Sequence, residues 1–318
     1  MKRNSLILFF TVLLASMAFV SCQNNQPKPF PHVSVEGVAD GDTTLYQAQN
    51  FWKDYLDPAR GAVSDTVMLA GVTYKDVNGA LAEYLKLLTK FNFDQVIECN
   101  GNFADLLIAY VNKTEDREVA AYLMTKFKRL FYDADSPYRN DEIALKLFNQ
   151  VLEAQVMDSL SASTMKFAAD KICLNRINQK VKDFSYVTTS GKEGSLYEIG
   201  GADYTLVIFG APDCPACTQT LNVCEQSSIA EAVENGRLNL LLMYVDQDIP
   251  AWTEYIKDRP KAWIKAFDNQ NVLNDLYDLK AVPTLYLLDK DMNLLIKDGA
   301  VAYVGGYLLG KGVLKDNR

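Results

Sequence analysis

Histidine is nearly absent from this sequence: His32, next to Pro31, is the single histidine among 318 residues. A Ser-His-Asp triad and a His-rich metal site both depend on imidazole groups held at folded positions, so the shortage excludes nearly every site of either kind. Long runs of lysine and arginine are missing too, and the formal net charge is −8. Nucleic acid is therefore not expected as a partner.

The sequence also lacks an apolar run long enough to span a membrane comfortably. The longest, residues 6–20, follows the basic pair Lys2 and Arg3 and falls short of the roughly 20 residues that a spanning helix needs. It stops at a small residue and Cys22, which resemble a bacterial lipobox, where the peptide is cut before the Cys and that Cys carries lipid. We therefore expect residues 1–22 to be a lipoprotein signal peptide with Cys22 lipidated. The alternative is an ordinary signal peptide with an incidental Cys.

Acidic residues are absent directly after Cys22, where the sequence reads QNNQ. Acidic residues there would resemble the surface-export signals of some lipoproteins, so their absence favours a periplasm-facing position in the cell envelope. Several acyl chains on one Cys would give stable membrane attachment. Disulfides persist in that compartment, and without Cys22 an odd number of cysteines remains, so at least one thiol stays unpaired within the monomer.

The mature part is longer than one core usually organises, so two domains are expected. Residues 23–41 are polar and proline-rich, which is typical of a tether. Residues 42–181 have a helical pattern, because apolar residues recur three and four positions apart from Val77 to Leu88, from Val119 to Leu130 and from Leu147 to Leu152.

Breaks in that pattern at residues 99–101 and 133–137 predict four to six helices in an all-α domain. Cys99 is expected beside a turn and Cys173 within a helix, with both thiols buried as small hydrophobic groups. A disulfide between the two is the alternative.

The pattern changes in residues 182–318, where strands and helices alternate. Continuous apolar runs predict strands buried on both faces, and the last two runs, around a polar turn, predict a hairpin. The strands are expected at residues 183–188, 206–209, 238–245, 285–288 and 294–296, and the helices around 218–224, 252–257 and 272–279. This order predicts an α/β fold, a mixed central sheet flanked by helices, after the all-α domain.

Two cysteines, Cys214 and Cys217, follow the strand at 206–209 in the sequence APDCPAC. A helical pattern begins after them, so Cys214 is expected at a helix N-terminus. There, unpaired N–H groups and the helix dipole stabilise a thiolate and lower the pKa of the thiol. Cys217 lies one turn further on, within the distance that a disulfide spans. The pair can therefore alternate between dithiol and disulfide.

This strand-CPAC-helix order resembles the thioredoxin superfamily, in particular its membrane-anchored, envelope-facing branch related to cytochrome c maturation. The likeness also rests on the strand that begins at Asp183, with its glycine turn, and on VPT at 282–284, where the family places a cis-proline. It covers about residues 181–310. The sequences SPYRNDE at 136–142 and FW at 51–52 are similar to a helical domain of undefined function that precedes such domains in bacterial lipoproteins.

The resemblance implies roles for single residues. Cys214 would be the attacking thiol and Cys217 the buried resolving thiol. The backbone before the cis-proline would pair with an extended substrate segment, and the substrate-binding positions would be Val282, Pro283, Thr284, Pro215 and Ala216. No metal and no cofactor beyond the Cys214–Cys217 disulfide are implied. The implied partners are disulfide-containing envelope proteins, with apocytochromes among the candidates, and a membrane electron donor.

Three positions depart from the family. Ile208 stands where thioredoxins themselves carry a buried Asp, and Thr220 stands where the cytochrome-maturation branch often carries a Glu. Neither usual proton acceptor for Cys217 is therefore present. Asp213 replaces the usual Trp, and its negative charge opposes thiolate formation at Cys214.

The sequence thus predicts a lipid-anchored thiol–disulfide oxidoreductase that reduces disulfides of envelope proteins, with a helical domain that positions it or selects clients. The alternative is an envelope binding or adaptor module whose thioredoxin-like scaffold carries a structural or vestigial disulfide, and the missing carboxylates motivate it. A metal site would have Cys224 as its third thiolate and no nearby His, so Cys224 is expected to pack in the core.

Overall fold

The computed structural model describes residues 27–38, 43–62, 64–268, 270 and 272–315. The predicted signal peptide and Cys22 lie outside these residues. Contacts between Cα atoms divide the chain into two compact units, one made of residues 1–131 with 142–166, the other of 132–141 with 167–318. By these contacts, residues 132–141 and 167–181, which the sequence pattern assigns to the helical domain, group with the second unit.

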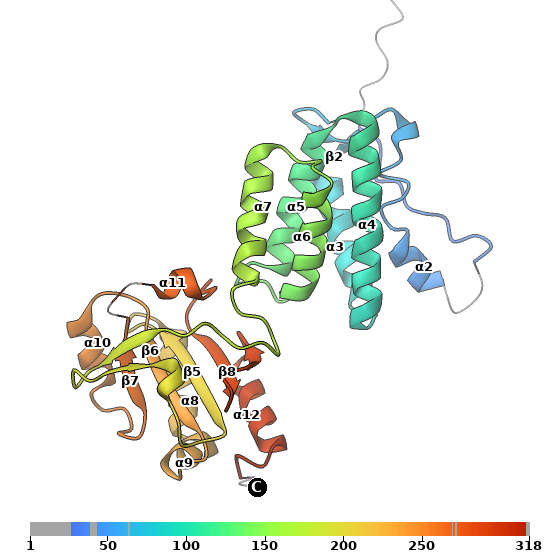
Figure 1. Cartoon of the computed structure of the whole chain (residues 1–318). Helices are drawn as coiled ribbons and strands as arrows, with labels where there is room; N and C mark the ends of the chain where they lie inside the picture. The colour runs from blue at the N-terminus through green and yellow to red at the C-terminus, as the bar shows by residue number, and fades with distance from the viewer. Residues whose placement is uncertain (1–26, 39–42, 63, 269, 271, 316–318) are drawn as a thin grey trace, which may run out of the picture. The chain divides into compact units, whose positions relative to one another are not determined.

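The first unit is helical, as the sequence predicts (Figure 1). The break predicted at residues 133–137 is confirmed, because it falls between two helices. The elements are α2 (Thr43–Gln49), the 3-10 helix η1 (Pro58–Arg60), the short strands β1 (Met68–Leu69) and β2 (Val72–Thr73), and the helices α3 (Tyr74–Leu88), α4 (Phe93–Thr114), α5 (Arg117–Phe131), α6 (Asp141–Glu153) and α7 (Ser159–Ile172). The last residues of α7 belong to the second unit.

Aromatic side chains form the centre of the first unit. Trp52 is 1% exposed, and its ring lies 5.3 Å from that of Phe103, which in turn stacks on Phe127 at 4.4 Å. Phe30 joins this group, because it is buried and stacks on Tyr55 at 4.9 Å. The predicted tether therefore ends before Phe30, and the chain packs against the helices from there.

Helix α4 runs without interruption through residues 99–101, so the break predicted there is wrong. Its N-terminus is set by Asn92, whose side chain accepts the N–H of Gln95 at 3.0 Å, while the Gln95 side chain accepts the N–H of Asn92 at 3.2 Å. Asn100 is tolerated inside the helix because its side-chain amide donates to the carbonyl one turn earlier. Cys99 consequently lies within a helix, buried and unpaired.

The second unit is built on a mixed sheet whose described strands have the order β4-β3-β7-β6-β5-β8-β9. The pairs β5–β6 and β6–β7 are parallel and the others antiparallel. The predicted hairpin is confirmed as β8 and β9. The strands are β3 (Ser185–Thr188), β4 (Glu193–Ser195), β5 (Tyr204–Gly210), β6 (Asn239–Tyr244), β7 (Ile264–Phe267), β8 (Thr284–Asp289) and β9 (Leu294–Lys297).

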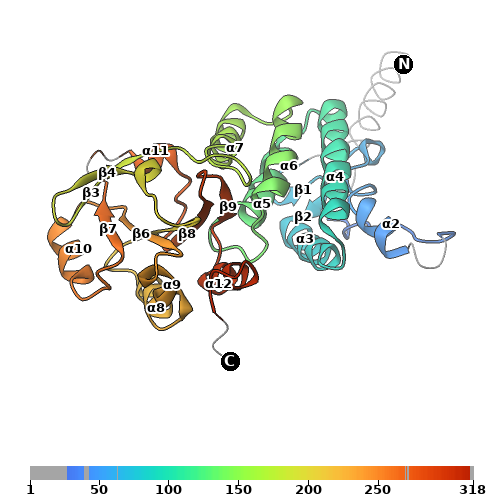
Figure 2. The same cartoon turned by 60° about the horizontal axis from the view of Figure 1, so that its bottom comes forward.

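Both faces of this sheet are buried, as the continuous apolar runs predict. Along β5, Leu206 and Ile208 pack into one hydrophobic cluster, and Val207 and Phe209 pack into another. Figure 2 shows α8, α9 and α12 on one side of the sheet and α11 on the other. The helices of the unit are α8 (Pro215–Glu225), α9 (Ser228–Glu234), α10 (Ile249–Ile256), α11 (Leu273–Leu276) and α12 (Val301–Gly310).

Some short elements differ from the sequence prediction. The helix expected at 272–279 ends at Leu276, because Tyr277 is extended, with φ −130° and ψ 148°, and buries its ring in the core. Helix α12 was missed because three of its ten residues are glycines. Helix α9 and strand β7 were missed because they are too short to show a period. Within the described part of the chain, no helix is long and apolar enough to cross a bilayer.

The continuity of α4 can be tested by Gly101→Ala. An added Cβ would meet nothing nearer than the Gln150 amide oxygen at 3.9 Å, so the substitution removes only the entropic cost of a helical glycine. We expect the free energy of unfolding to rise by about 0.5–1 kcal/mol in urea titrations followed by circular dichroism.

Gly71→Ala is the control in the same unit. Gly71 has φ +74°, and its Cβ would lie 2.9 Å from the Ala62 Cβ, so this variant should lose stability. A loss of stability in Gly101→Ala as well would mean that α4 is interrupted at this residue.

Candidate dithiol site

Cys214 lies between the central strand β5 and helix α8. It is the N-cap of α8, with extended φ −113° and ψ 103°, and Pro215 takes the first helical position, where a missing N–H costs nothing. The Cys214 sulfur accepts the backbone N–H of Cys217 at 3.0 Å. The predicted position at a helix N-terminus is confirmed, and the N–H groups there favour a negatively charged sulfur.

Cys214 and Cys217 form a disulfide with their Cα atoms 5.1 Å apart. Cys214 is half-buried, whereas Cys217 is 1% exposed and faces the core. Of the two sulfurs, that of Cys214 is therefore the one that a dissolved molecule can approach.

The loop that leads into β8, the strand next to β5, faces Cys214. The Val282–Pro283 peptide is cis, as the resemblance implies, and the Val282 carbonyl oxygen lies 3.4 Å from the Cys214 sulfur. A disulfide sulfur has no proton to give, so this is a contact in the oxidised form. In the dithiol form, the Cys214 S–H can donate to that oxygen.

The other residues named from the sequence surround these two groups. Pro215 and Ala216 are exposed on the first turn of α8, and Val282 and Pro283 are half-buried. Thr284 is only 6% exposed, and its hydroxyl donates to the Ala281 carbonyl at 2.6 Å. Thr284 therefore braces the cis-proline loop instead of offering a side chain to a ligand.

No carboxylate occupies the usual positions beside Cys217. Ile208 is fully buried in the core, and Thr220 is a half-buried hydroxyl residue on α8. Glu225, later on the same helix, is engaged by Arg259, whose guanidinium lies 3.0 Å away. Gly210 packs directly against Cys217, since an added Cβ there would lie 3.7 Å from the sulfur.

The other three cysteines within the described residues, Cys99, Cys173 and Cys224, are unpaired. Cys224 packs in the core, as expected, and burial with the nearby Glu225 raises the pKa of its thiol to about 12. Burial likewise raises the pKa of the Cys99 thiol to about 11. Cys173, expected to be buried, is exposed because α7 ends one residue earlier. Its disulfide with Cys99 does not form. Among the described residues, no three His, Cys, Asp or Glu side chains are grouped to hold a metal ion.

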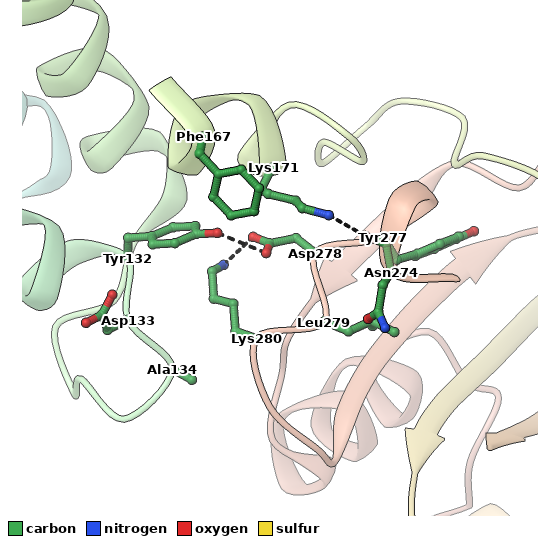
Figure 3. Close-up of a pocket in the computed structure, with 10 residues that line it drawn as sticks. All are labelled: Tyr132, Asp133, Ala134, Phe167, Lys171, Asn274, Tyr277, Asp278, Leu279 and Lys280. Atoms are coloured by element: carbon green, nitrogen blue, oxygen red, sulfur yellow. Dashed lines mark hydrogen bonds and ion pairs between the residues drawn. The ribbon is translucent and has the colours of Figure 1, made fainter. Parts of the chain in front are cut away.

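A hollow of about 390 Å³ adjoins the segment that leads to the cis-proline (Figure 3). One wall consists of Tyr277, Asp278, Leu279 and Lys280, and the opposite wall includes Phe167, which is 62% exposed. Sequence reasoning missed these residues. The available signal was the pair of opposite charges, Asp278 and Lys280, close to the cis-proline.

The comparisons with known proteins agree with this architecture. Residues 201–294 match a family model described as thioredoxin-like. A crystal structure of a thioredoxin-like protein from Bacteroides caccae ATCC 43185 superposes with a TM-score of 0.73 at 27% identity, covering 89% of this chain and 99% of that chain. The C-terminal domain of an uncharacterized protein from Bacteroides fragilis NCTC 9343 is 35% identical, with a TM-score of 0.41, over 43% of this chain and 99% of that chain.

A nucleoredoxin from Danio rerio is 26% identical over 100 residues, which are 31% of this chain. The match spans about a quarter of that relative, 24% of its length. The sheet order, the family match and the similarity to the Bacteroides caccae structure lead to one conclusion: the C-terminal part of this chain is a thioredoxin-like domain, and a helical region precedes it.

Proposed function

We propose that the protein is a thiol–disulfide oxidoreductase that reduces disulfides of other proteins through Cys214 and Cys217. One observation carries the proposal: an accessible Cys214 sulfur caps helix α8, forms a disulfide with a buried Cys217 and lies against the cis Val282–Pro283 peptide. Cys214 is placed to attack a client disulfide, Cys217 to resolve the mixed disulfide, and the backbone at Val282 to align the client.

The reaction begins with the reduced pair. The Cys214 thiolate attacks one sulfur of a client disulfide, forming a mixed disulfide and releasing the other client sulfur as a thiolate that takes up a proton. Cys217 then loses its proton and attacks the Cys214 sulfur, which forms the Cys214–Cys217 disulfide and releases the second client sulfur. Two electrons and two protons pass to the client. A dithiol electron donor restores the reduced pair by the same exchange in reverse.

The environment of Cys214 favours the first step. The Cys217 N–H at 3.0 Å and the N-terminal dipole of α8 stabilise the thiolate, while the neighbouring Asp213 opposes it. Cys217, buried and without a carboxylate at the usual positions, has weaker help for losing its proton. Resolution is therefore the slower of the two exchange steps at neutral pH.

The proposed clients are disulfide-containing proteins of the cell envelope. Support comes from the half-buried backbone at Val282, which can pair with an extended client segment, and from the lipobox-like Cys22, which would tether the protein to a membrane facing the periplasm. The same signal suggests a membrane electron donor. Apocytochromes are one client class within this proposal, which rests on the resemblance to cytochrome-maturation thioredoxins.

The alternative is an adaptor in which the Cys214–Cys217 disulfide is structural. The missing carboxylates at Ile208 and Thr220 favour it. The two functions differ in one assay: reduction of insulin with dithiothreitol as electron source.

We expect the wild-type protein to accelerate insulin reduction above the rate of dithiothreitol alone, and Cys214→Ser to abolish that acceleration. The reason is that only the Cys214 sulfur is accessible for the first exchange. Turbidity of the released insulin B chain measures the rate, and Cys173→Ser, which removes an exposed cysteine outside the site, should behave as wild type. An adaptor would give the reagent rate in every variant.

Trapping identifies the clients and tests the two roles. Cys217→Ser leaves Cys214 able to attack but removes the group that resolves the mixed disulfide, so clients should accumulate covalently bound. Cys214→Ser should trap at least about tenfold less, because Cys217 is buried. Non-reducing gels and mass spectrometry of the complexes provide the measurement. Equal trapping by both variants contradicts the assignment of Cys214 as the nucleophile.

The missing carboxylate predicts a pH dependence for resolution. The rate at which the mixed disulfide disappears should rise with pH toward the pKa of Cys217. Thr220→Glu should speed this step at pH 7 by up to about 100-fold, the lower end of what a positioned base contributes. Acid quenching with mass spectrometry follows the intermediate, and Thr220→Gln controls for side-chain size. No gain with Glu over Gln would show that another group already accepts the proton.

A further inference from the structure

Charged residues beside the dithiol site have no part in the exchange reaction. They are three carboxylates, three cations and one phenol, here called the charge network: Asp141, Asp278, Asp298, Arg139, Lys280, Lys297 and Tyr132. All seven belong to the second unit. The side chains of Asp278, Lys280, Lys297 and Asp298 are only 5–8% exposed. Burying so many charges is costly unless each is paired, so their arrangement is specific.

Lys280 is the centre of the network. Its ammonium nitrogen lies 2.7 Å from an Asp278 oxygen, 3.2 Å from an Asp141 oxygen and 4.3 Å from the centre of the Tyr132 ring. The Tyr132 hydroxyl donates to the second Asp278 oxygen at 3.0 Å. Figure 3 shows Tyr132 and Lys280 reaching Asp278 together. The carboxylate of Asp278 and the ammonium group of Lys280 are thus each held by more than one partner.

The network is anchored on two further sides. Asp141 also pairs with Lys297 of β9 at 2.7 Å, and Arg139 donates to the backbone carbonyl of Asp298 at 3.2 Å. Burial opposes ionisation of Asp141, but Lys297 and Lys280 outweigh it and keep the pKa of that carboxyl below its usual value. Asp141 therefore stays charged at neutral pH.

The Tyr132 hydroxyl likewise keeps its proton at neutral pH. Burial, with the adjacent Asp278, raises the pKa of the Tyr132 phenol well above its usual value. The hydroxyl therefore remains a donor to Asp278 across the physiological pH range.

The segment held in this way has few other attachments, of which the Thr284 hydroxyl on the Ala281 carbonyl is one. Among the described residues, no hydrogen bond between backbone groups involves residues 278–283, whereas from Thr284 onward the chain is fixed in β8 between β5 and β9. Together with the Thr284 hydroxyl on Ala281, the side chains of Asp278 and Lys280 are therefore the polar anchors on the N-terminal side of the cis-proline. Lys280 is two residues before Val282, so their Cα atoms are at most about 7.6 Å apart.

We propose that Tyr132, Arg139 and Asp141 are positioning residues for the dithiol site, which hold Asp278 and Lys280 and thereby fix the Val282 backbone against Cys214. Tyr132 and Arg139 lie in the connection between α5 and α6, Asp141 is the first residue of α6, and Arg139 and Asp141 belong to the sequence SPYRNDE. The inference gives this segment a role in the redox site, and its effect on clients rests on the proposed function.

The first test needs no client. The Val282 carbonyl oxygen 3.4 Å from the Cys214 sulfur favours the protonated thiol, because it accepts the S–H and repels a thiolate. Tyr132→Phe removes only the hydroxyl that holds Asp278, so the loop should loosen and the pKa of Cys214 should fall. A fall of half a unit raises the rate of alkylation of the reduced protein at pH 6 by about threefold.

Tyr122→Phe is the matched control, because Tyr122 lies on α5 and its hydroxyl is bonded to Asn78, outside the network. Asp278→Asn should act in the same direction as Tyr132→Phe, and the double variant should be no faster than the stronger single one. An alkylation profile for Tyr132→Phe that matches those of wild type and Tyr122→Phe at every pH overturns the positioning role. Circular dichroism establishes that each variant is folded.

The second test uses two substrates. A disulfide-containing extended peptide needs the Val282 backbone, whereas 2-hydroxyethyl disulfide needs only the Cys214 sulfur. Tyr132→Phe should raise KM for the peptide about fivefold and leave kcat within about twofold, and it should not slow reduction of the small disulfide, which gains from any increase in Cys214 thiolate. Equal losses on both substrates would mean a general loss of structure and overturn the positioning role. If the wild-type protein reduces neither substrate, the proposed function fails, while the alkylation result still decides the positioning role.

Discussion

The pairing of two central strands is the constraint on which the candidate site depends. Phe209, near the end of β5, is the register partner of Thr284, the first residue of β8. Because the strands are antiparallel, the chain leaving β5 and the chain entering β8 meet at the same edge of the sheet. This register brings Cys214 and the Val282–Pro283 peptide together, although they are 68 residues apart. A shift of β8 by one residue would exchange the side chains that it presents to the two buried faces of the sheet.

Much of this arrangement follows from local sequence. Strands buried on both faces show as continuous apolar runs, and the CPAC sequence after β5 marks both the helix start and the disulfide. The break at 133–137 is visible because Pro137 and its polar neighbours disfavour a helix. These predictions succeed because each depends on residues close together in the chain. The likeness to thioredoxins added the cis peptide before Pro283, which no spacing could supply.

Other features depend on partners far away in the chain. Asn100 and Gly101 suggest a turn by themselves, but the capping box at Asn92 and the apolar stripe of α4 make the helix continue. The charge network could not be predicted, because Tyr132 and Asp278 are 146 residues apart and every member is a common surface residue type. The hydrophobic clusters tolerate many packings, whereas the network requires particular pairs of charged and hydrogen-bonding groups. Such pairs do not recur at a fixed spacing, so they leave no periodic pattern in the sequence.

The division of the chain into two units has a consequence for the order in which the protein can be completed. Residues 132–141 belong to the second unit, although 142–166, which follow them, belong to the first. A chain made from its N-terminus exposes Asp141 long before Lys280 and Lys297 exist. At about 5–20 residues per second, residue 298 follows about 8 to 31 s later. Until then the charged side chains of this segment are solvated. When Lys280 and Lys297 are synthesised, the residues with which they form ion pairs are already present in the chain.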